Sequence, residues 1–362
     1  MASLMIVFCM QVYFLLRYYL KLARHRDSAP LQNFNQISII LSVRNEEQHI
    51  REILDKFNVQ QFEDYQLLVI NVHSEDNTDG ILNVMAETNP KLKVTSLSQE
   101  TQFSEKQIIN IGLKGASSPW IVLLTSSSGV IHPSWLDGMN SLLSPDTEVV
   151  IAYTNIERLK GFRNLICRLE RFNQFTISGA WTLAGKPFVF NENNILFKKS
   201  MYFDTLGFRH KMNRNFANLE LIFNENMKKG RVKLTTNPEL AIREHIEDDR
   251  GDHIRLLKKG VQIRQSLPWS KKISLFLDDL TRILLPGLTA TLIILHPEYW
   301  ITFSVFPLIF LILLAIIVKM LLNRLNEPKI FLSSLVYILI KPMINWCVFW
   351  FMYLLQRRSR WN

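Results

Sequence analysis

Two serines occupy the place in the sequence where a binding or catalytic side chain is most expected. The apolar run Trp120–Leu124 has the length and β-branched character of a buried strand, and it stops in the polar turn Thr125–Gly129. Ligands of open α/β sheets lie outside the carboxyl ends of the strands, so the side chains of Ser126 and Ser128 should project into a site. A solvated turn that contacts nothing is the alternative interpretation of the same residues.

Two earlier segments have the same order of strand, polar turn and helix. Ile37–Val43 (ISIILSV) predicts a buried strand, and the acids of Arg44–Glu47 suit the positive N-terminal end of a helix that runs to about Phe57. Tyr65–Val72 (YQLLVINV) predicts a second strand, which ends in the polar residues His73–Gly80 before a further helix. This repetition indicates a parallel α/β sheet.

These motifs resemble, in order and spacing, those of the family 2 nucleotide-sugar glycosyltransferases. In that family SVRNEE-like residues follow the first strand, DDxSxDxT-like residues follow the second, and Pro and Trp follow an Asp-x-Asp motif. This chain has SVRNEE, then NVHSEDNT, then SSS followed by Pro133, Trp135 and Leu136. The resemblance extends from Ile37 to about Glu244. It implies an α/β fold, a Rossmann-like GT-A nucleotide-sugar-binding domain, here flanked by transmembrane helices.

The resemblance also implies which residues bind the donor. They are Arg44, Asn45, Glu46, Asn71, Ser74, Asp76, Lys106, Ser126 and Ser128. Asn71 and Val72 replace the acids that hold the nucleotide base, and only Asn71 retains an acceptor oxygen. Mg²⁺ or Mn²⁺ is expected for the family, but both acids of its Asp-x-Asp motif are serine here, and these cations prefer anionic oxygen. We therefore expect weak nucleotide-sugar binding that is nearly independent of metal.

The segment that carries the general base in inverting members has lost its acidic pair. It reads RNFANLEL, and Glu220 is its only acid, so Glu220 is the candidate catalytic base. The alternative is that Glu220 lies on the polar face of an ordinary amphipathic helix. Gln262 and Arg264 are candidates for contact with the acceptor or with phosphate. Together with Trp269 they depart from the Gln-x-x-Arg-Trp spacing of processive members, so polymer synthesis is not expected.

A charged segment between Glu244 and Pro268 contains two histidines and several acids. The spacing of His245 and His253 fits no compact metal motif, so a solvated interfacial helix is the preferred interpretation. The three cysteines of the chain lie far apart and indicate neither a disulfide framework nor a zinc site.

Composition places the chain at a membrane. Of the 362 residues 48% are hydrophobic although 20% are charged, so the apolar residues must be unevenly distributed. They concentrate in residues 2–20 and in three candidate segments, 283–295, 300–322 and 330–355. Much of the net charge of +10 flanks these segments, which is typical of cytoplasmic flanks and of contact with anionic lipids. Nucleic acid is not an expected partner.

We therefore predict three regions: an N-terminal transmembrane helix in residues 1–26, a GT-A domain in 34–270, and a C-terminal membrane region in 271–362. The basic residues Lys21, Arg24 and Arg26 predict that the middle domain faces the cytoplasm from an inner-membrane anchor. The same rule conflicts with a fully spanning last segment, which would leave the basic C-terminal residues outside. A bend at Lys341–Pro342, giving a re-entrant or interfacial segment, would remove the conflict.

Two functions remain open at this point. The first is an enzyme that transfers a sugar from a nucleotide sugar to a lipid-linked or polysaccharide acceptor. The second is a catalytically silent homologue that acts as a scaffold for another glycosyltransferase or for a glycan lipid.

Overall fold

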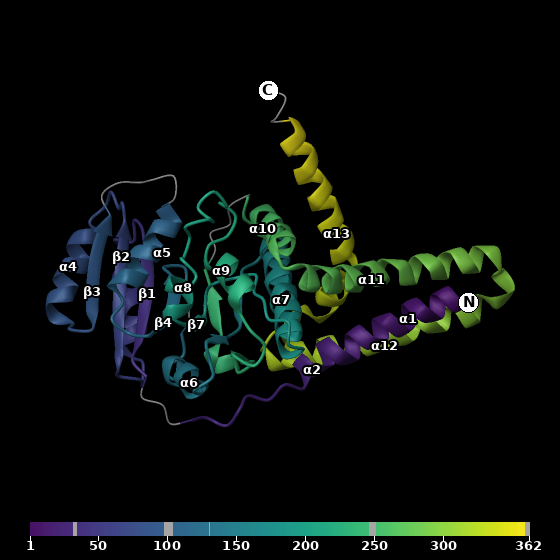
Figure 1. Cartoon of the computed structure of the whole chain (residues 1–362), viewed down its shortest axis with the longest axis horizontal. Coiled ribbons are helices and arrows are strands. Elements are labelled where there is room, and N and C mark those ends of the chain that lie inside the picture. The colour runs from purple at the N-terminus through teal and green to yellow at the C-terminus, as the bar shows by residue number, and fades with distance from the viewer. Residues whose placement is uncertain (32–34, 98–103, 130, 246–250, 359–362) are drawn as a thin grey trace. The chain divides into compact units, whose positions relative to one another are not determined.

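The computed structural model describes residues 1–31, 35–97, 104–129, 131–245 and 251–358 (Figure 1). The chain forms two compact units. The sheet unit comprises Arg26–Leu159 and Pro187–Asp249, and the helical unit comprises Met1–His25, Lys160–Lys186 and Arg250–Asn362.

A seven-stranded sheet organises the sheet unit, with the strand order β3-β2-β1-β4-β7-β5-β8. Its strands are β1 (Ile37–Val43), β2 (Tyr65–Val72), β3 (Leu92–Leu97), β4 (Trp120–Thr125), β5 (Val149–Ile151), β7 (Ile195–Lys198) and β8 (Val232–Leu234). The first four in this order are parallel, whereas β7 is antiparallel to β4 and β5. A separate pair joins β6 (Thr154–Ile156) to β9 (Ile242–Glu244).

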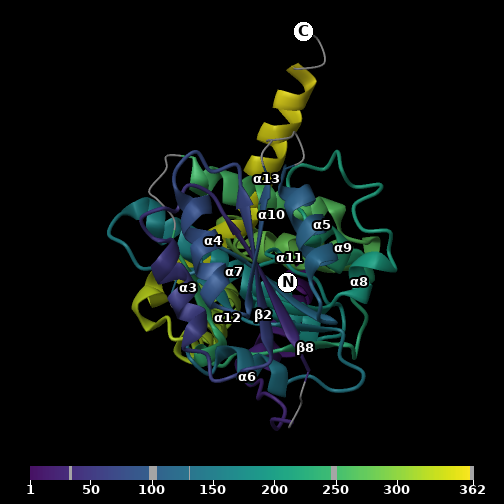
Figure 2. The same ribbon diagram turned by 90° about the vertical axis from the view of Figure 1, so that its left-hand side faces the viewer.

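The parallel strands are buried because helices cover both faces, which accounts for their near-continuous apolar sequences. The helices of this unit are α3 (Ile50–Asn58), α4 (Thr78–Thr88), α5 (Ser104–Gly115), α6 (Trp135–Ser141), α8 (Ser200–Phe203) and α9 (Leu219–Asn226). Helix α5 approaches β1 so closely that a Cβ atom at Gly112 would lie 2.6 Å from Cγ2 of Ile40. Figure 2 looks along the stacked sheet and helix layers.

The predicted α/β sheet is confirmed, and the predicted strands 37–43 and 65–72 have the predicted bounds. The prediction that Arg44–Glu47 opens a helix is wrong. Helix α3 begins only at Ile50, because Asn45 has a left-handed backbone (φ 53°) and the amides of Asn45, Glu46 and Glu47 are bound by side chains of the neighbouring loop.

The helical unit contains the apolar ends of the chain. Its elements are α1 (Ala2–Phe14), a π-helical turn (Leu15–Tyr19), α2 (Leu20–Ala23), α7 (Phe162–Leu183), α10 (Asp252–Ser266), α11 (Trp269–Leu295), α12 (Trp300–Arg324) and α13 (Phe331–Arg358). Three stretches of helix are long and apolar enough to cross a membrane: Ala2–Ala23, Pro297–Arg324 and Phe331–Leu354. Candidate membrane helices therefore flank the sheet unit in sequence, as expected.

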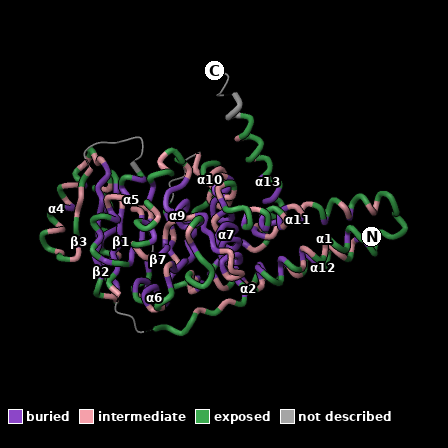
Figure 3. The backbone as a smooth tube through the Cα atoms, viewed as in Figure 1, coloured by how far each residue is buried: buried purple, intermediate pink, exposed green. Residues whose placement is uncertain are grey.

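Helices α1, α11 and α12 lie side by side, and the second half of α13 runs across their common direction (Figure 1). Figure 3 shows that much of the surface of α1, α11 and α12 is exposed towards the end where α11 turns into α12. Many of the exposed residues there are apolar and include Met5, Ile294, Leu295 and Ile301. An exposed apolar surface of this kind is typical of contact with a membrane or with another protein.

Buried polar groups join α11 to the first helix. The side chain of Gln11 donates to the backbone oxygen of Asp278 (2.9 Å) and to Thr281 Oγ1 (2.5 Å). Tyr19 donates to Asp278 Oδ2 (2.8 Å), and the Arg282 guanidinium donates to the same carboxylate oxygen (2.8 Å). Because a buried charge is tolerated only with such partners, these contacts fix how α1 and α11 pack.

Two features differ from the expectations drawn from the sequence. Helices α7 and α10 fall within the predicted 34–270 domain but pack with the apolar helices in the helical unit. Helix α13 continues through Lys341–Pro342 without a break. The Lys341 ammonium pairs with Glu170 of α7 at 2.6 Å, so its charge is neutralised inside the helical unit and requires no interruption of the helix.

Candidate functional site

The loops that follow β1 and β2 are bound to each other by a set of reciprocal hydrogen bonds. Backbone amides of the first loop donate to side chains of the second: Asn45 to Ser74 Oγ (2.9 Å), Glu46 to Thr78 Oγ1 (2.9 Å) and Glu47 to Asp76 Oδ2 (3.0 Å). In return, amides of the second loop donate to side chains of the first: Glu75 to Asn45 Oδ1 (2.9 Å) and Asn77 to Glu47 Oε2 (3.1 Å). The two loops therefore form one structure at the carboxyl edge of the sheet.

The predicted donor residues of these loops thus support one another, and Arg44 lies exposed beside them. Burial alone would raise the pKa of Asp76, but hydrogen bonds from the Thr78 hydroxyl and from the amides of Glu47 and Thr78 hold that pKa below its ordinary value. Asp76 is accordingly ionised at neutral pH. It uses that charge to anchor the loops.

Asn71 is buried at the end of β2 and is engaged within this edge. Its Nδ2 donates to Asp79 Oδ1 at 3.0 Å, and its Oδ1 accepts from the Ser74 hydroxyl at 2.5 Å. The acceptor oxygen that was expected to meet a nucleotide base therefore already serves the loop. Recognition of a base by Asn71 would require Ser74 to rotate away or to share that oxygen.

The serine turn lies at the end of β4, next to β1. Ser126 donates its backbone amide to Ser42, and Ser126 itself is half-buried. Ser128 is buried, and its hydroxyl oxygen lies 3.4 Å from the amide nitrogen of Thr125. Of the two serines, Ser126 is the one that remains accessible to a ligand.

Acids that sequence reasoning did not single out surround this turn. Glu244 forms a β-bridge with Ser128, and its carboxylate accepts from the side chain of Asn193. Glu157 pairs with His245 Nδ1 at 3.1 Å, and a Cβ atom on Gly129 would collide with the Glu157 carboxylate. The sequence offered a signal only for Glu244, which closes a strand of the family pattern.

These residues do not fit the divalent cation that the family uses. Glu244 and Glu157 already have Asn193 and His245 as partners, and the turn itself offers only neutral hydroxyls. Among the residues that the structure describes, no group of three or more His, Cys, Asp or Glu side chains is arranged to hold a metal ion. Part of the charged segment considered in the sequence, residues 246–250, lies outside the described residues.

Glu220 lies in the first turn of α9 and is fully buried, with 0% of its surface exposed. Its Oε2 accepts from the backbone amide of Asn218 at 2.9 Å, so the carboxylate caps the N-terminus of its own helix. Leu219 and Leu221 on either side of it are also buried. A buried cap explains the presence of an acid here without any role in proton transfer.

A second carboxylate, Glu192, also reaches the start of α9. Its Oε2 accepts from the Leu219 amide at 2.7 Å, and its Oε1 accepts from Asn218 Nδ2 at 3.1 Å. Unlike Glu220, Glu192 is only half-buried. Asn218 also donates to Glu105 at 2.9 Å. Glu192 lies in the family-like segment NENNILFKK, but the sequence did not single it out, because the resemblance to the family rests on the asparagines beside it.

Lys106 lies on α5 and joins the same cluster. It is buried, with 4% exposed, and its ammonium donates to the backbone oxygen of Arg214 at 2.9 Å and to Asn218 Oδ1 at 3.4 Å. The ring of Phe208 lies 5.7 Å from it. Lys106 and the carboxylates of Glu105, Glu192 and Glu220 all lie at the start of α9, where Lys106 supplies positive charge.

The remaining predicted residues, Gln262 and Arg264, lie on α10 of the helical unit, whereas the others belong to the sheet unit. Arg264 pairs with Asp279 of α11. The structure therefore gathers Asn45, Glu46 and their loop partners at one edge of the sheet, and it assigns Arg264 to a different environment.

Comparison with known proteins bears on this arrangement. Residues 38–201 match the model of the family described as "Glycosyl transferase family 2". A curated protein of Haemophilus influenzae described as an uncharacterized glycosyltransferase is 24% identical over 127 residues, which are 35% of this chain and 38% of that protein. The match thus spans well under half the length of that relative.

One solved structure resembles nearly the whole chain. It is the mannosyltransferase PcManGT from Pyrobaculum calidifontis in complex with GDP-Man and Mn²⁺. The similarity covers 93% of this chain and 96% of that one with a TM-score of 0.58, at 18% sequence identity. This degree of likeness shows a shared fold.

Proposed function

We propose that this chain, whose residues 38–201 match the glycosyl transferase family 2 model, transfers a sugar from a nucleotide sugar to a lipid-linked acceptor at a membrane, with Glu192 as the general base. The observation that carries this proposal is the half-buried Glu192 carboxylate at the start of α9. A base must come within hydrogen-bond reach of the attacking hydroxyl, and Glu192 is more accessible than the buried cap Glu220. The three candidate membrane helices support an acceptor carried by lipid.

The roles of the other residues follow from their contacts. The loop amides and side chains of residues 44–47 and 74–78 provide a preorganised edge for the nucleotide, since their geometry is already fixed by reciprocal hydrogen bonds. Positive charge for the leaving diphosphate comes from Arg44, which is exposed at this edge. Because no described carboxylate set fits a divalent cation, we derive no step through one.

The test is sugar transfer by the purified full-length chain with GDP-mannose, UDP-glucose and dTDP-glucose, using lipid extract as acceptor. GDP-mannose is the first choice because the structurally similar mannosyltransferase from Pyrobaculum calidifontis was solved in complex with it. Glu192→Gln keeps the size of the side chain and an acceptor for one of its two hydrogen bonds at the start of α9 but removes basicity, so turnover should fall on the order of 10²-fold or more. Glu220→Gln is the matched control, because it changes the other carboxylate that bonds the start of α9, and it should lower thermal stability more than turnover.

The opposite pattern, with turnover lost in Glu220→Gln at an unchanged melting temperature and kept in Glu192→Gln, would assign the base to Glu220. Proton transfer by Glu192 would then be excluded, although the transferase function would stand.

A second candidate, a catalytically silent homologue that supports a partner glycosyltransferase, is favoured by a specific observation. The side-chain amide of Asn71 already bonds to Asp79 and Ser74, and Ser126 and Ser128 are neutral. If this function is correct, wild-type protein transfers no sugar and Glu192→Gln leaves cellular glycan unchanged, whereas deletion of the gene lowers it. The double change Ser126→Asp and Ser128→Asp would then restore metal binding without activity.

The proposed location is the inner, cytoplasmic membrane, with the sheet unit on the cytoplasmic side. This is supported by Lys21, Arg24 and Arg26 at the end of the first apolar helix, because basic residues favour the cytoplasmic flank.

A further inference from the structure

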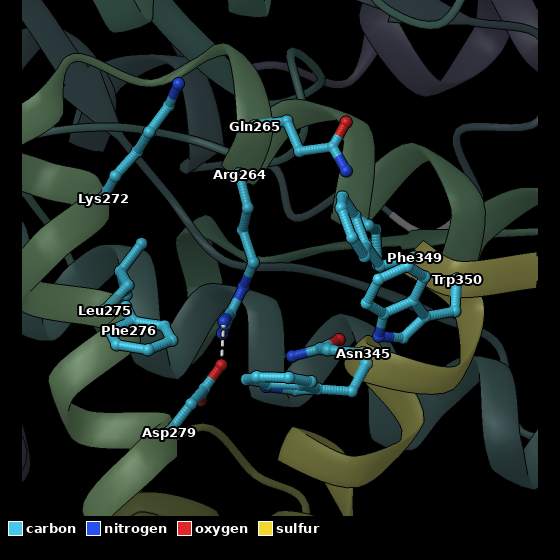
Figure 4. A pocket seen from close by; sticks show the side chains of 11 residues that line it. Arg264, Gln265, Lys272, Leu275, Phe276, Asp279, Asn345, Phe349 and Trp350 are labelled. Carbon is cyan, nitrogen blue, oxygen red and sulfur yellow. Dashed lines mark hydrogen bonds and ion pairs between the residues drawn. The ribbon is translucent and has the colours of Figure 1, made fainter. Parts of the chain in front are cut away.

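A cavity of about 440 Å³ lies in the helical unit between α10, α11 and α13 (Figure 4). This volume is in the range of small-molecule sites, roughly 300–1,000 Å³. Most of its wall is apolar and aromatic: Leu275 and Phe276 of α11, and Trp346, Phe349 and Trp350 of α13. The cavity therefore suits a ligand with a hydrocarbon portion.

Two cations line the same cavity. Arg264 of α10 forms an ion pair with Asp279 across it, and the Lys272 ammonium lies 5.3 Å from the ring centroid of Trp269. The guanidinium has five N–H donors, so the single carboxylate of Asp279 does not exhaust it. Two positive charges face one negative charge, which leaves the cavity favourable for an anion.

Asn345 of α13 gives an independent indication of a ligand. Its side chain lines the cavity and only 8% of the residue is exposed, yet its Nδ2 has no hydrogen-bond partner among the described residues. Figure 4 shows this amide turned toward the Arg264–Asp279 pair. Buried amides in folded proteins are nearly always satisfied, so an acceptor oxygen from a ligand is expected at this point.

We propose that this cavity binds the phosphate group of a membrane lipid, with the hydrocarbon chain along the aromatic wall of α13. Arg264, Lys272 and Asn345 all offer donors, and a phosphate oxygen only accepts. A free anion would leave the apolar wall unused, whereas a lipid uses both parts. The wall continues outward along α13 into exposed apolar residues such as Phe351 and Leu354. The proposal concerns binding in the helical unit and does not depend on sugar transfer.

The test is lipid retention by the full-length protein, measured by native mass spectrometry after titration with dioleoyl phosphatidic acid or dioleoyl phosphatidylcholine. Phosphatidic acid exposes its phosphate, and it should bind at least tenfold more tightly than phosphatidylcholine. Lys272→Gln and Asn345→Asp should each reduce this preference by about tenfold. Lys319→Gln is the matched control, because it removes the same charge from an exposed position of α12 outside the cavity.

Equal retention of the two lipids, or the same loss in Lys319→Gln as in Lys272→Gln, would overturn the proposal. Lys272 is half-buried, so its substitution should leave the fold intact, and circular dichroism of each variant checks this. If Asn345→Asp fails to fold, Asn345→Leu, which removes the donor at similar volume, replaces it with the same expected loss of preference.

Two further probes identify the source of the phosphate. Inorganic phosphate that competes with phosphatidic acid at equal affinity would show a site for free anions and contradict a lipid site. Farnesyl monophosphate that binds more tightly than phosphatidic acid would support the proposal and assign the cavity to an isoprenoid lipid. Weaker binding of farnesyl monophosphate would support it with an ordinary phospholipid as the occupant.

Discussion

Asp79 connects three segments at the carboxyl edge of the sheet. Its carboxylate accepts hydrogen bonds from the Ser96 hydroxyl, from Asn71 and from Asn83, and these bonds, with Ser96 the strongest influence, hold the pKa of Asp79 below its ordinary value. A lowered pKa in the folded state means that the carboxylate stabilises the fold above the ordinary carboxyl pKa of about 3.9, and that this contribution disappears as the pH falls through the folded-state pKa.

We therefore predict that Asp79→Asn lowers the stability at pH 7 by about 1 kcal/mol, the typical net value of a hydrogen bond, and that the difference from wild type shrinks between about pH 5 and pH 3. Thermal unfolding of both proteins at pH 7, 5, 4 and 3 measures this. Asp55→Asn, at an exposed position of α3, is the control and should change little. A deficit that persists unchanged at pH 3 would show that shape, not charge, is what Asp79 contributes.

The neutral side chains of the serine turn also lead to a prediction about the effect of a divalent cation on binding. Because Ser126 and Ser128 supply hydroxyls and the nearby acids are engaged, Mn²⁺ should improve nucleotide-sugar binding less than tenfold, a difference of about 1.4 kcal/mol. Calorimetric titration with GDP-mannose and UDP-glucose, in the presence and absence of millimolar Mn²⁺, checks this prediction. A larger gain would reveal cation ligands outside the set described above, and Asp76→Asn would be the first variant to examine.

At the scale of single elements, the strands of the sheet could be predicted closely, because continuous apolar runs bounded by polar turns leave few alternatives. The conformation of the loop after β1 could not be predicted from the sequence. Its sequence suits a helix start, and only Ser74, Asp76 and Thr78, about thirty residues away, decide that its amides are used otherwise. The role of Glu220 was open for another reason: its bond to the Asn218 amide is local, but its complete burial depends on how α9 packs in the fold.

Helix α13 shows how a partner from another element overrides a local signal. Lys341–Pro342 is unfavourable within an apolar helix, yet Lys341 and Tyr337 both contact the buried carboxylate of Glu170 at 2.6 and 2.5 Å. Gln174 donates to the other oxygen of Glu170 at 2.8 Å. The sequence alone gave no means of pairing residues 170 and 341, so a break in the helix was the natural hypothesis.

This pairing predicts a strong asymmetry between single and double variants. Lys341→Met should destabilise the protein by about 3–5 kcal/mol, because it leaves the Glu170 charge buried with neutral partners only. The double change Lys341→Met and Glu170→Leu should recover most of that loss, since apolar residues of similar volume often replace a buried pair without cost. Thermal unfolding in detergent measures both. Additive losses in the double variant would argue against the pair.

At the scale of the whole molecule, the packing of the helical unit bears on how the chain crosses a membrane. Helix α11 is not one of the candidate membrane spans. It lies alongside α1 and α12, and each of these helices belongs to a candidate span. If α1 and α12 cross, the apolar half of α11 crosses with them. Its charged half, with Asp278 and Arg282, is then satisfied by buried partners such as Tyr19.

Counting α11 as a crossing places the basic residues that flank α1, α11 and α12 together, and the conflict over the basic C-terminal residues is removed if α13 does not cross. The residues after α1, those at the start of α11 and those at the end of α12 then share one side, as the positive-inside rule requires. Helix α13 runs across the other helices and is lined by Trp346 and Trp350, so it can lie along the interface, where tryptophan is favoured. A lipid phosphate in the cavity beside α13 would then sit at headgroup depth.

This topology predicts opposite accessibility for two exposed acids. Glu87 lies on α4 of the sheet unit, and Glu298 lies in the turn between α11 and α12. In a Cys9→Ser, Cys347→Ser background, which removes the exposed native thiols, Glu298→Cys should react with a membrane-impermeant maleimide in intact cells, and Glu87→Cys should react only after the membrane is permeabilised. The buried Cys167 remains in both variants and provides a common baseline.

Ready labelling of Glu87→Cys from outside would reverse the proposed sidedness. Protection of both sites in intact cells would mean that the α11–α12 turn does not reach the far side, and that α11 and α12 form a hairpin that enters the membrane and returns.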